Sequence, residues 1–157
     1  MLKIRIIVVD RTRAGFLREG ESFYLKRLRY YATVEWAVVK PVKIVKGKND
    51  RGILNAEGEA VERKLFPKEY VVALDRTGDP MDSEGIADWL DNLARQASGG
   101  VSFVIGGPLG LSKNILKRAQ KVFSLSRLTL THEMSRLVLL EQLYRAMTIL
   151  SGEKYHK

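Results

Sequence analysis

The spacing of apolar residues along the chain changes repeatedly between that of strands and that of helices. The segment Leu2 to Val9 is β-branched and apolar, and Val101 to Ile105 is apolar throughout. Continuous apolar runs of this length are typical of strands covered on both faces of a sheet. Between these two segments, Ile86, Trp89 and Leu93 recur at helical spacing and predict an amphipathic helix.

The same reading along the whole chain predicts five strands separated by helices. The strands are expected at residues 2–9, 34–39, 70–74, 101–105 and 122–125. The helices are expected at residues 15–29 and 53–65, then after a cap at Ser83, and at about 113–121 and 133–150. Residues 75–78 are expected to form a turn and residues 40–52 a long loop. This alternation predicts an α/β fold, with a mostly parallel sheet and helices on both faces.

Length and composition narrow the classes of protein. A chain of 157 residues and 17.8 kDa fits a single domain, residues 1–157. With no cysteine and only two histidines, it excludes disulfides, thiolate zinc sites and histidine-rich metal sites. No apolar run approaches the ~20 residues of a membrane span, and the first ten residues are too short and too charged for a signal peptide. We therefore expect a cytoplasmic protein with no metal and no membrane contact.

Positive charge is concentrated in the first half of the chain. Lys and Arg total 27 against 18 Asp and Glu, a net charge of +9, and +7 of it lies within residues 1–65. The expected long loop contributes Lys40, Lys43, Lys46, Lys48 and Arg51. A one-sided basic surface attracts polyanions, of which nucleic acid is the commonest. The alternative is a solvated loop that aids solubility.

The first candidate for chemistry is the loop Gly106-Gly107-Pro108-Leu109-Gly110, which directly follows an expected strand. Open α/β sheets bind small molecules at the carboxyl ends of their strands, and glycines let the backbone approach a ligand closely. The loop is neither GxGxxG nor a P-loop, which argues against a nucleoside triphosphatase. The alternative is a tight structural turn.

The second candidate is the stretch from Ser124 to His132, in which hydroxyl and leucine residues alternate. Backbone amides and carbonyls beside apolar walls suit an adenine ring, which needs hydrogen bonds at its edge and flat apolar contact. The alternative is an edge strand with Ser and Thr on its wet face. His132 is expected to cap or pack against the following helix rather than to act in catalysis.

The last helix and the tail provide two further candidates. Apolar residues cover most of the circumference of helix 133–150, which predicts burial on two sides, the second being a subunit interface. Arg145 is a candidate for an intersubunit ion pair or an RNA phosphate, or else it is solvated. In the tail, Tyr155 could stack on a base and His156 could handle a proton, although chain ends usually fray.

Together and in this order, these segments resemble the RlmH-type ribosomal RNA methyltransferases, small members of the SPOUT superfamily. The resemblance covers the whole chain. It is carried by Leu74-Asp75 with Gly78, Ser83-Glu84-Gly85, Phe103 to Gly107 with Gly110, Ser124-Leu125-Ser126, Thr129 with His132, Glu141-Gln142 with Tyr144-Arg145-Ala146, and Tyr155-His156. It implies a C-terminal trefoil knot and methyl transfer from S-adenosylmethionine to N3 of pseudouridine 1915 in the 23S rRNA of the assembled ribosome.

The resemblance also implies the site residues. Those expected to surround the cofactor are Leu74, Gly106, Leu125, Ser126, Arg127, Leu128, Thr129 and Leu130. Arg145, Tyr155 and His156 match positions implicated in substrate binding or catalysis. In this family the pocket lies at a homodimer interface, and the tail is expected to reach the cofactor site of the partner.

Our hypothesis for the reaction is that His156 helps to accept the N3 proton, Tyr155 orients the base, and Arg145 stabilises an oxyanion or grips a phosphate. One alternative is a knotted methyltransferase that acts on another RNA, such as tRNA. A second alternative is a non-catalytic ribosome-binding factor. The sequence does not contain the phosphate-binding motif of a nucleotidase or dehydrogenase, which argues against both classes.

Overall fold

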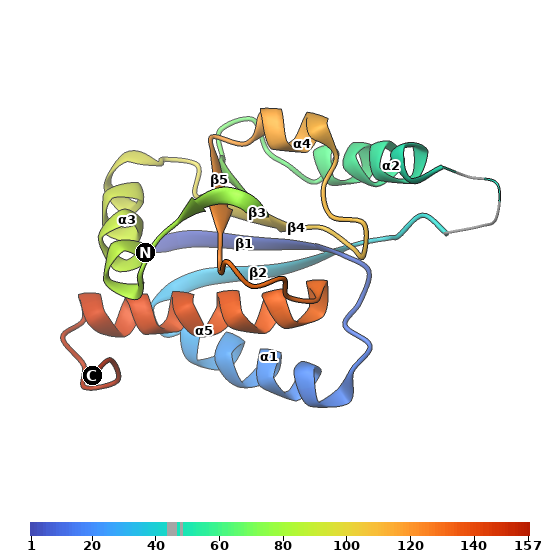
Figure 1. Cartoon of the computed structure of the whole chain (residues 1–157). Coiled ribbons are helices and arrows are strands. Elements are labelled where there is room, and N and C mark those ends of the chain that lie inside the picture. Colours follow the sequence, from blue (N-terminus) through green and yellow to red (C-terminus); the bar gives the residue numbers. More distant parts are fainter. Residues whose placement is uncertain (44–46, 48) are drawn as a thin grey trace.

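The computed structural model describes residues 1–43, 47 and 49–157, which form one five-stranded sheet with helices on both faces (Figure 1). The strands are β1 (Leu2–Val9), β2 (Ala32–Val39), β3 (Tyr70–Pro80), β4 (Val101–Ile105) and β5 (Lys121–Ser124). The helices are α1 (Gly15–Leu28), α2 (Asp50–Glu62), α3 (Ser83–Gln96), α4 (Lys113–Arg118) and α5 (His132–Leu150). Lys46 and Lys48 of the expected basic loop lie outside the described residues.

The sheet order is β2-β1-β4-β3-β5, and every paired strand runs parallel to its neighbour. Alternate residues of a strand point to opposite faces. In β1, Ile4 and Ile6 therefore join a core formed with α1, α3 and α5, whereas Ile7 and Val9 join a smaller core on the side of α2 and α4. The expected α/β class and parallel sheet are confirmed.

The predicted turn at residues 75–78 is wrong, because β3 continues through it to Pro80. The register with β5 shifts between Leu74 and Asp79, both of which lie opposite Phe123. Within this irregularity the Asp75 carboxylate accepts hydrogen bonds from the amide and hydroxyl of Thr77. A Cβ on Gly78 would lie 2.6 Å from the backbone of Val122, so glycine permits close contact between the strands. The turn-forming residues produce a bulge in the strand instead of ending it.

Two helix caps differ from expectation by one residue. The N-cap of α3 is Asp82, whose side chain accepts from Gly85 N at 2.7 Å, so the prediction of Ser83 as the cap is wrong. The hydroxyl of Ser83 donates instead to Gln142 Oε1 on α5, at 2.6 Å. At α5 the cap is Thr131, and His132 is the first helical residue, half-buried as expected for a packed histidine.

A buried arginine ties α5 to the loop that follows β1. Arg136, on the first half of α5, is 0% exposed. Its guanidinium donates to Val9 O at 2.7 Å and to Thr12 Oγ1 at 2.9 Å, and Thr12 donates in turn to the buried carboxylate of Glu21 at 2.7 Å. A buried guanidinium requires such acceptors. This network fixes the end of β1 against α5.

The carboxylate of Glu133 caps α1 from a distance in sequence. The N-cap residue of α1 is Ala14, which has no side-chain acceptor of its own. Glu133 Oε1 instead accepts from the amide of Ala14 itself at 3.1 Å and from that of Arg13, the residue before it, at 2.9 Å. Burial opposes ionisation, but these two amide donors hold the pKa of Glu133 below its ordinary value of 4.5.

Replacing Glu133 with Ala should lower the free energy of unfolding by about 1 kcal/mol, because the amides of Arg13 and Ala14 at the start of α1 lose their acceptor. Urea titration of the wild type, Glu133→Ala and the exposed control Glu19→Ala measures the loss. Since the folded-state pKa is depressed, the difference should be full above pH 4.5 and should shrink as the pH falls through the folded-state value. Equal stability of Glu133→Ala and Glu19→Ala would show that the contact contributes nothing.

Candidate functional site

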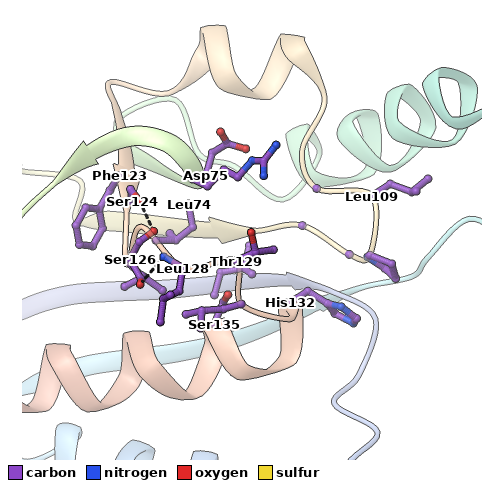
Figure 2. Close-up of a pocket in the computed structure, with 18 residues that line it drawn as sticks. Leu74, Asp75, Leu109, Phe123, Ser124, Ser126, Leu128, Thr129, His132 and Ser135 are labelled. Atoms are coloured by element: carbon purple, nitrogen blue, oxygen red, sulfur yellow. Dashed lines mark hydrogen bonds between the residues drawn. The ribbon is translucent and has the colours of Figure 1, made fainter.

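A cavity of about 430 Å³ opens at the carboxyl edge of the sheet (Figure 2). Its walls come from the irregular part of β3, from the end of β4 and the loop after it, from the end of β5 and the segment after it, and from the first turn of α5. The lining residues are Leu74 to Arg76, Ile105 to Gly110, Phe123 to Ser126, Leu128 to Leu130, His132 and Ser135. Parallel strands bring these segments together because all their carboxyl ends share one edge.

The glycine loop after β4 forms one wall. Gly107 and Gly110 pair as a short bridge, with Gly110 N donating to Gly107 O at 3.0 Å. A Cβ on Gly106 would lie 2.2 Å from Gly110 O, so no side chain fits there without moving the backbone. Gly110 has φ +83°, a conformation that glycine adopts at little cost. The loop is therefore both a tight turn and part of the cavity wall.

The segment after β5 forms the opposite wall and is a loop beyond Ser124, not the edge strand considered as its alternative. Two serine hydroxyls stabilise the local path of this loop. Ser124 Oγ donates to Ser126 O at 3.0 Å, and Ser126 Oγ accepts from Leu128 N at 2.9 Å. Figure 2 shows Leu74, Ser126 and Leu128 gathered in the cavity. Leu128 is 72% exposed, which leaves an apolar surface open beside backbone polar groups.

The structure brings together seven of the eight residues expected around the cofactor. Leu74, Gly106, Leu125, Ser126, Leu128, Thr129 and Leu130 line the cavity. Arg127 is exposed and does not line it. Sequence reasoning did not select Asp75, Arg76, Phe123 or Ser135, although their positions at the carboxyl ends of strands or the start of α5 were the available signal.

His132 also lines the cavity, at the first turn of α5. Burial, reinforced by the nearby charge of Arg136, lowers the pKa of His132 below its ordinary value of 6.5. The imidazole is therefore mostly neutral at pH 7 and offers one donor and one acceptor to the cavity.

A second cluster lies on the last turns of α5 and the tail. Arg145 Nε donates to Glu141 Oε1 at 3.1 Å, and the Tyr155 hydroxyl donates to the same oxygen at 3.1 Å. The guanidinium of Arg145 also lies over the Tyr155 ring, 4.8 Å from its centroid. Nδ1 of His156 lies 3.3 Å from Arg145 Nη1. The three residues singled out from this part of the sequence are thus in mutual contact, and the tail packs against the helix.

The electrostatics of this cluster set its protonation. The hydrogen bond to Glu141 raises the pKa of Arg145, so the guanidinium stays charged. Burial, together with the Glu141 carboxylate, raises the pKa of the Tyr155 phenol above its ordinary value of 10.0. Tyr155 is therefore a hydrogen-bond donor and not a base. Because a guanidinium only donates, His156 Nδ1 accepts in this arrangement, and the proton of the neutral ring is on Nε2.

Glu141 is the residue that sequence reasoning did not assign. Its Oε1 accepts from Arg145 and Tyr155, and its Oε2 accepts from Gln142 Nε2 at 2.7 Å. The available signal was the separation of four residues between Glu141 and Arg145 on one helix, a spacing typical of ion pairs.

The cavity and the tail cluster lie at opposite ends of α5. From Ser135, which lines the cavity, to Arg145 is ten residues of helix, or about 15 Å at 1.5 Å per residue. Figure 1 shows the C-terminus beside the end of α5 that is remote from the carboxyl edge of the sheet. Within one chain, the tail therefore does not contribute to the cavity that its own loops form.

Across residues 1–43, 47 and 49–157, no group of three or more His, Cys, Asp or Glu side chains is placed to hold a metal ion. In that same part of the chain, no helix is long and apolar enough to cross a membrane.

Comparison with known proteins gives consistent results. Residues 2–156 match the model of a family described as predicted SPOUT methyltransferase. A protein of Desulfotalea psychrophila named ribosomal RNA large subunit methyltransferase H is 42% identical over 99% of this chain and 100% of its own length. A protein of the same name from Moorella thermoacetica is 42% identical over the full length of both chains.

Solved structures agree on the fold. A probable methyltransferase from Bordetella pertussis superposes with a TM-score of 0.59 at 15% identity, covering 93% of this chain and 96% of that one. A probable methylase family protein from Haemophilus influenzae superposes with a TM-score of 0.59 at 14% identity. The match covers 100% of this chain and 72% of that one.

The glycine loop provides a test of the cavity as a binding site for S-adenosylmethionine. Gly106→Ala should lower the affinity at least about tenfold, because its Cβ would displace Gly110 O and so reshape the wall. Gly107→Ala is the matched control, since the nearest atom to its Cβ would be Val9 Cγ1 at 3.5 Å, an ordinary contact. Calorimetric titration measures both. Equal affinities in the two variants would show that the cofactor does not touch this wall.

Proposed function

Because the chain belongs to the SPOUT methyltransferase family, we propose that it transfers a methyl group from S-adenosylmethionine to N3 of a pseudouridine in the 23S rRNA of the assembled ribosome. The observation that carries the proposal is the extent of the match. Relatives named for large-subunit rRNA methylation align with 99–100% of this chain, so both the cavity and the tail cluster lie inside the shared length. The proposal places the enzyme in the cytoplasm, where ribosomes are.

The cavity fits the cofactor in size and chemistry. Its volume of about 430 Å³ lies in the range of small-molecule sites. Leu74, Leu125 and Leu130 would provide apolar contact for the adenine ring, and the backbone of residues 125–130 would provide hydrogen bonds at its edge. The neighbouring glycine loop would let the backbone approach the rest of the molecule closely. When bound, the cofactor supplies a sulfonium methyl group whose carbon an in-line nucleophile can attack, with the neutral thioether as the leaving group.

The protein has two tasks in this reaction, alignment and proton removal. Holding two reactants in line can contribute ~7–11 kcal/mol. The N3–H of the base must lose its proton as nitrogen attacks the methyl carbon, and His156 is the proposed acceptor. Its Nδ1 is engaged by Arg145 in this structure. As negative charge develops on a carbonyl oxygen of the base, Arg145 would donate to that oxygen instead, leaving Nδ1 free to accept the proton. Tyr155 would orient the base.

The distance along α5 makes a second copy part of the proposal. If the cavity binds the cofactor and the tail cluster acts on the base, two chains share each site. One chain supplies the cavity, and its partner supplies the tail cluster. Exposed apolar surface on α1 supports a homodimer: Phe16 is 69% and Phe23 48% exposed. Both lie on the helix that packs against α5, where Gly20 admits the side chain of Leu137.

The trefoil knot also belongs to this proposal. Residues 125–131 lead from β5, at the edge of the sheet, to α5, on the face that α1 and α3 cover. The chain thus crosses the carboxyl ends of strands that precede it in the sequence. Such a path is what threading in this family requires.

The function is tested by offering labelled methyl donor with assembled ribosomes, free 23S rRNA and tRNA. We expect methylation of ribosomes, and mass mapping of rRNA from cells that lack the gene should show one pseudouridine without its N3-methyl group, restored by the protein. Methylation of tRNA alone would favour the alternative acceptor. The absence of saturable heat with S-adenosylmethionine would favour a ribosome-binding factor without catalysis.

His156→Ala should reduce single-turnover methylation about a hundredfold or more, the usual contribution of a general base, while cofactor affinity stays near that of the wild type. Arg145→Ala should abolish activity mainly by weakening acceptor binding or alignment. Rapid-quench kinetics and calorimetry separate the two effects. Wild-type turnover by His156→Ala would remove this residue from the mechanism.

Complementation between subunits tests the shared site. Gly106→Ala carries a damaged cavity and an intact tail, and Arg145→Ala the reverse. After co-refolding, a statistical mixture of dimers should recover about a quarter of the wild-type sites, because each heterodimer assembles one intact pair. Methylation by the mixture, compared with each variant alone, measures the recovery. If the site formed within one chain, the mixture would remain as inactive as its components.

A further inference from the structure

The loop that follows β1 is strained and yet firmly held. Asp10 has φ +70°, the one positive value among the described residues other than glycine. This left-handed conformation costs on the order of 1–2 kcal/mol for a residue with a Cβ. It persists only where the surroundings fix it, and such positions cluster at functional sites.

The interior of the protein fixes this loop from several sides. Asp10 N donates to Val39 O at 2.8 Å, and the fully buried Arg136 holds Val9 O and Thr12 Oγ1. Glu133 holds the amides of Arg13 and Ala14. The backbone from the end of β1 to the start of α1 is therefore preorganised, and ligand binding there would cost little ordering entropy.

The outward side of the loop is cationic. Residues 10–18 contain three arginines and one acid, Asp10. Arg18 folds back and donates to the carbonyls of Thr12 and Arg13. The side chain of Arg13 is 60% exposed and pairs with Asp10 at 3.0 Å. Arg11 is exposed, and its guanidinium has no hydrogen bond or ion pair with any residue that the structure describes.

This cationic surface lies at the rim of the cavity. The carboxylate that holds the loop belongs to Glu133, which is adjacent to His132 and two residues from Ser135, both of which line the cavity. β1 is also paired with β4, whose glycine loop forms the cavity wall. A polyanion held by Arg11 and Arg13 would therefore pass beside the cavity entrance.

We propose that Arg11 and Arg13, displayed by the strained loop after β1, bind the phosphate backbone of the RNA next to the target base. This rests on the proposed function. Guanidinium groups bind phosphate oxygens in a bidentate manner, and backbone contacts fix register without reading sequence. The loop thus acts in positioning the RNA, and the chemistry belongs to other residues.

The test compares Arg11→Gln/Arg13→Gln with Lys26→Gln/Arg29→Gln, which removes the same charge from exposed positions at the far end of α1. Arg11→Gln alone is included because it leaves the Asp10–Arg13 pair intact. Ribosome binding is measured over a range of salt concentrations, together with methylation kinetics, cofactor affinity, melting temperature and oligomeric state.

We expect Arg11→Gln/Arg13→Gln to weaken ribosome binding about three- to tenfold and to reduce the slope of log K against log salt by roughly one to two. The KM for ribosomes should rise while kcat, cofactor affinity and melting temperature stay near wild type. Arg11→Gln alone should give about half of the change in slope. The control variant should keep the wild-type KM and differ little in slope.

Three results would overturn the proposal. The first is a salt slope equal to that of the wild type, and the second is an equal loss in the control, which would indicate net charge alone. The third is dissociation of the dimer in Arg11→Gln/Arg13→Gln, which would assign the loop to a second copy of the chain. Failure of the proposed function would appear differently. The wild-type protein would bind ribosomes with a normal dependence on salt but would transfer no methyl group.

Discussion

Parallel pairing of the five strands is the constraint on which the rest of this structure depends. β4 lies between β1 and β3, so the hydrogen bonds on both of its sides place three carboxyl ends next to one another. Segments that are far apart in sequence, the loops at residues 10–14 and 106–110 and the irregular part of β3 at residues 74–76, then share one edge. The cavity at that edge needs no additional domain, because the strand order alone brings its walls together.

Much of the fold could be predicted from the sequence, because buried parallel strands have a strong local pattern. Val101 to Ile105 is a strand over the predicted residues, and Leu2 to Val9 likewise. The turn at residues 75–78 was wrong because Asp, Thr and Gly favour turns and bulges alike, and only pairing with Phe123 decides between them. The burial of Arg136 escaped prediction since its acceptors, Val9 and Thr12, are more than 120 residues away in sequence.

The site was predictable to a different extent in its two parts. The composition of the glycine loop and of the stretch from Ser124 to His132 marked both as candidates. The structure places most of their residues around one cavity. The tail had no such signal, since an isolated Tyr-His pair at a chain end is expected to fray. It is ordered here because Glu141 accepts from both Arg145 and Tyr155, a contact that only the folded helix creates. Resemblance to a family, rather than residue chemistry, identified that part.

The length of α5 has a consequence for how such chains can vary. The helix has 19 residues, with the cavity contact at its first turn and Glu141 and Arg145 of the tail cluster in its second half. Inserting one residue between them would advance everything beyond it by about 1.5 Å and rotate it by about 100°. Glu141 and Arg145 would keep their contact with each other, but both would turn away from their present orientation relative to the cavity residues. The helix therefore fixes both the distance and the relative orientation of the two sites. Natural variation in chain length should occur in surface loops and not within this helix.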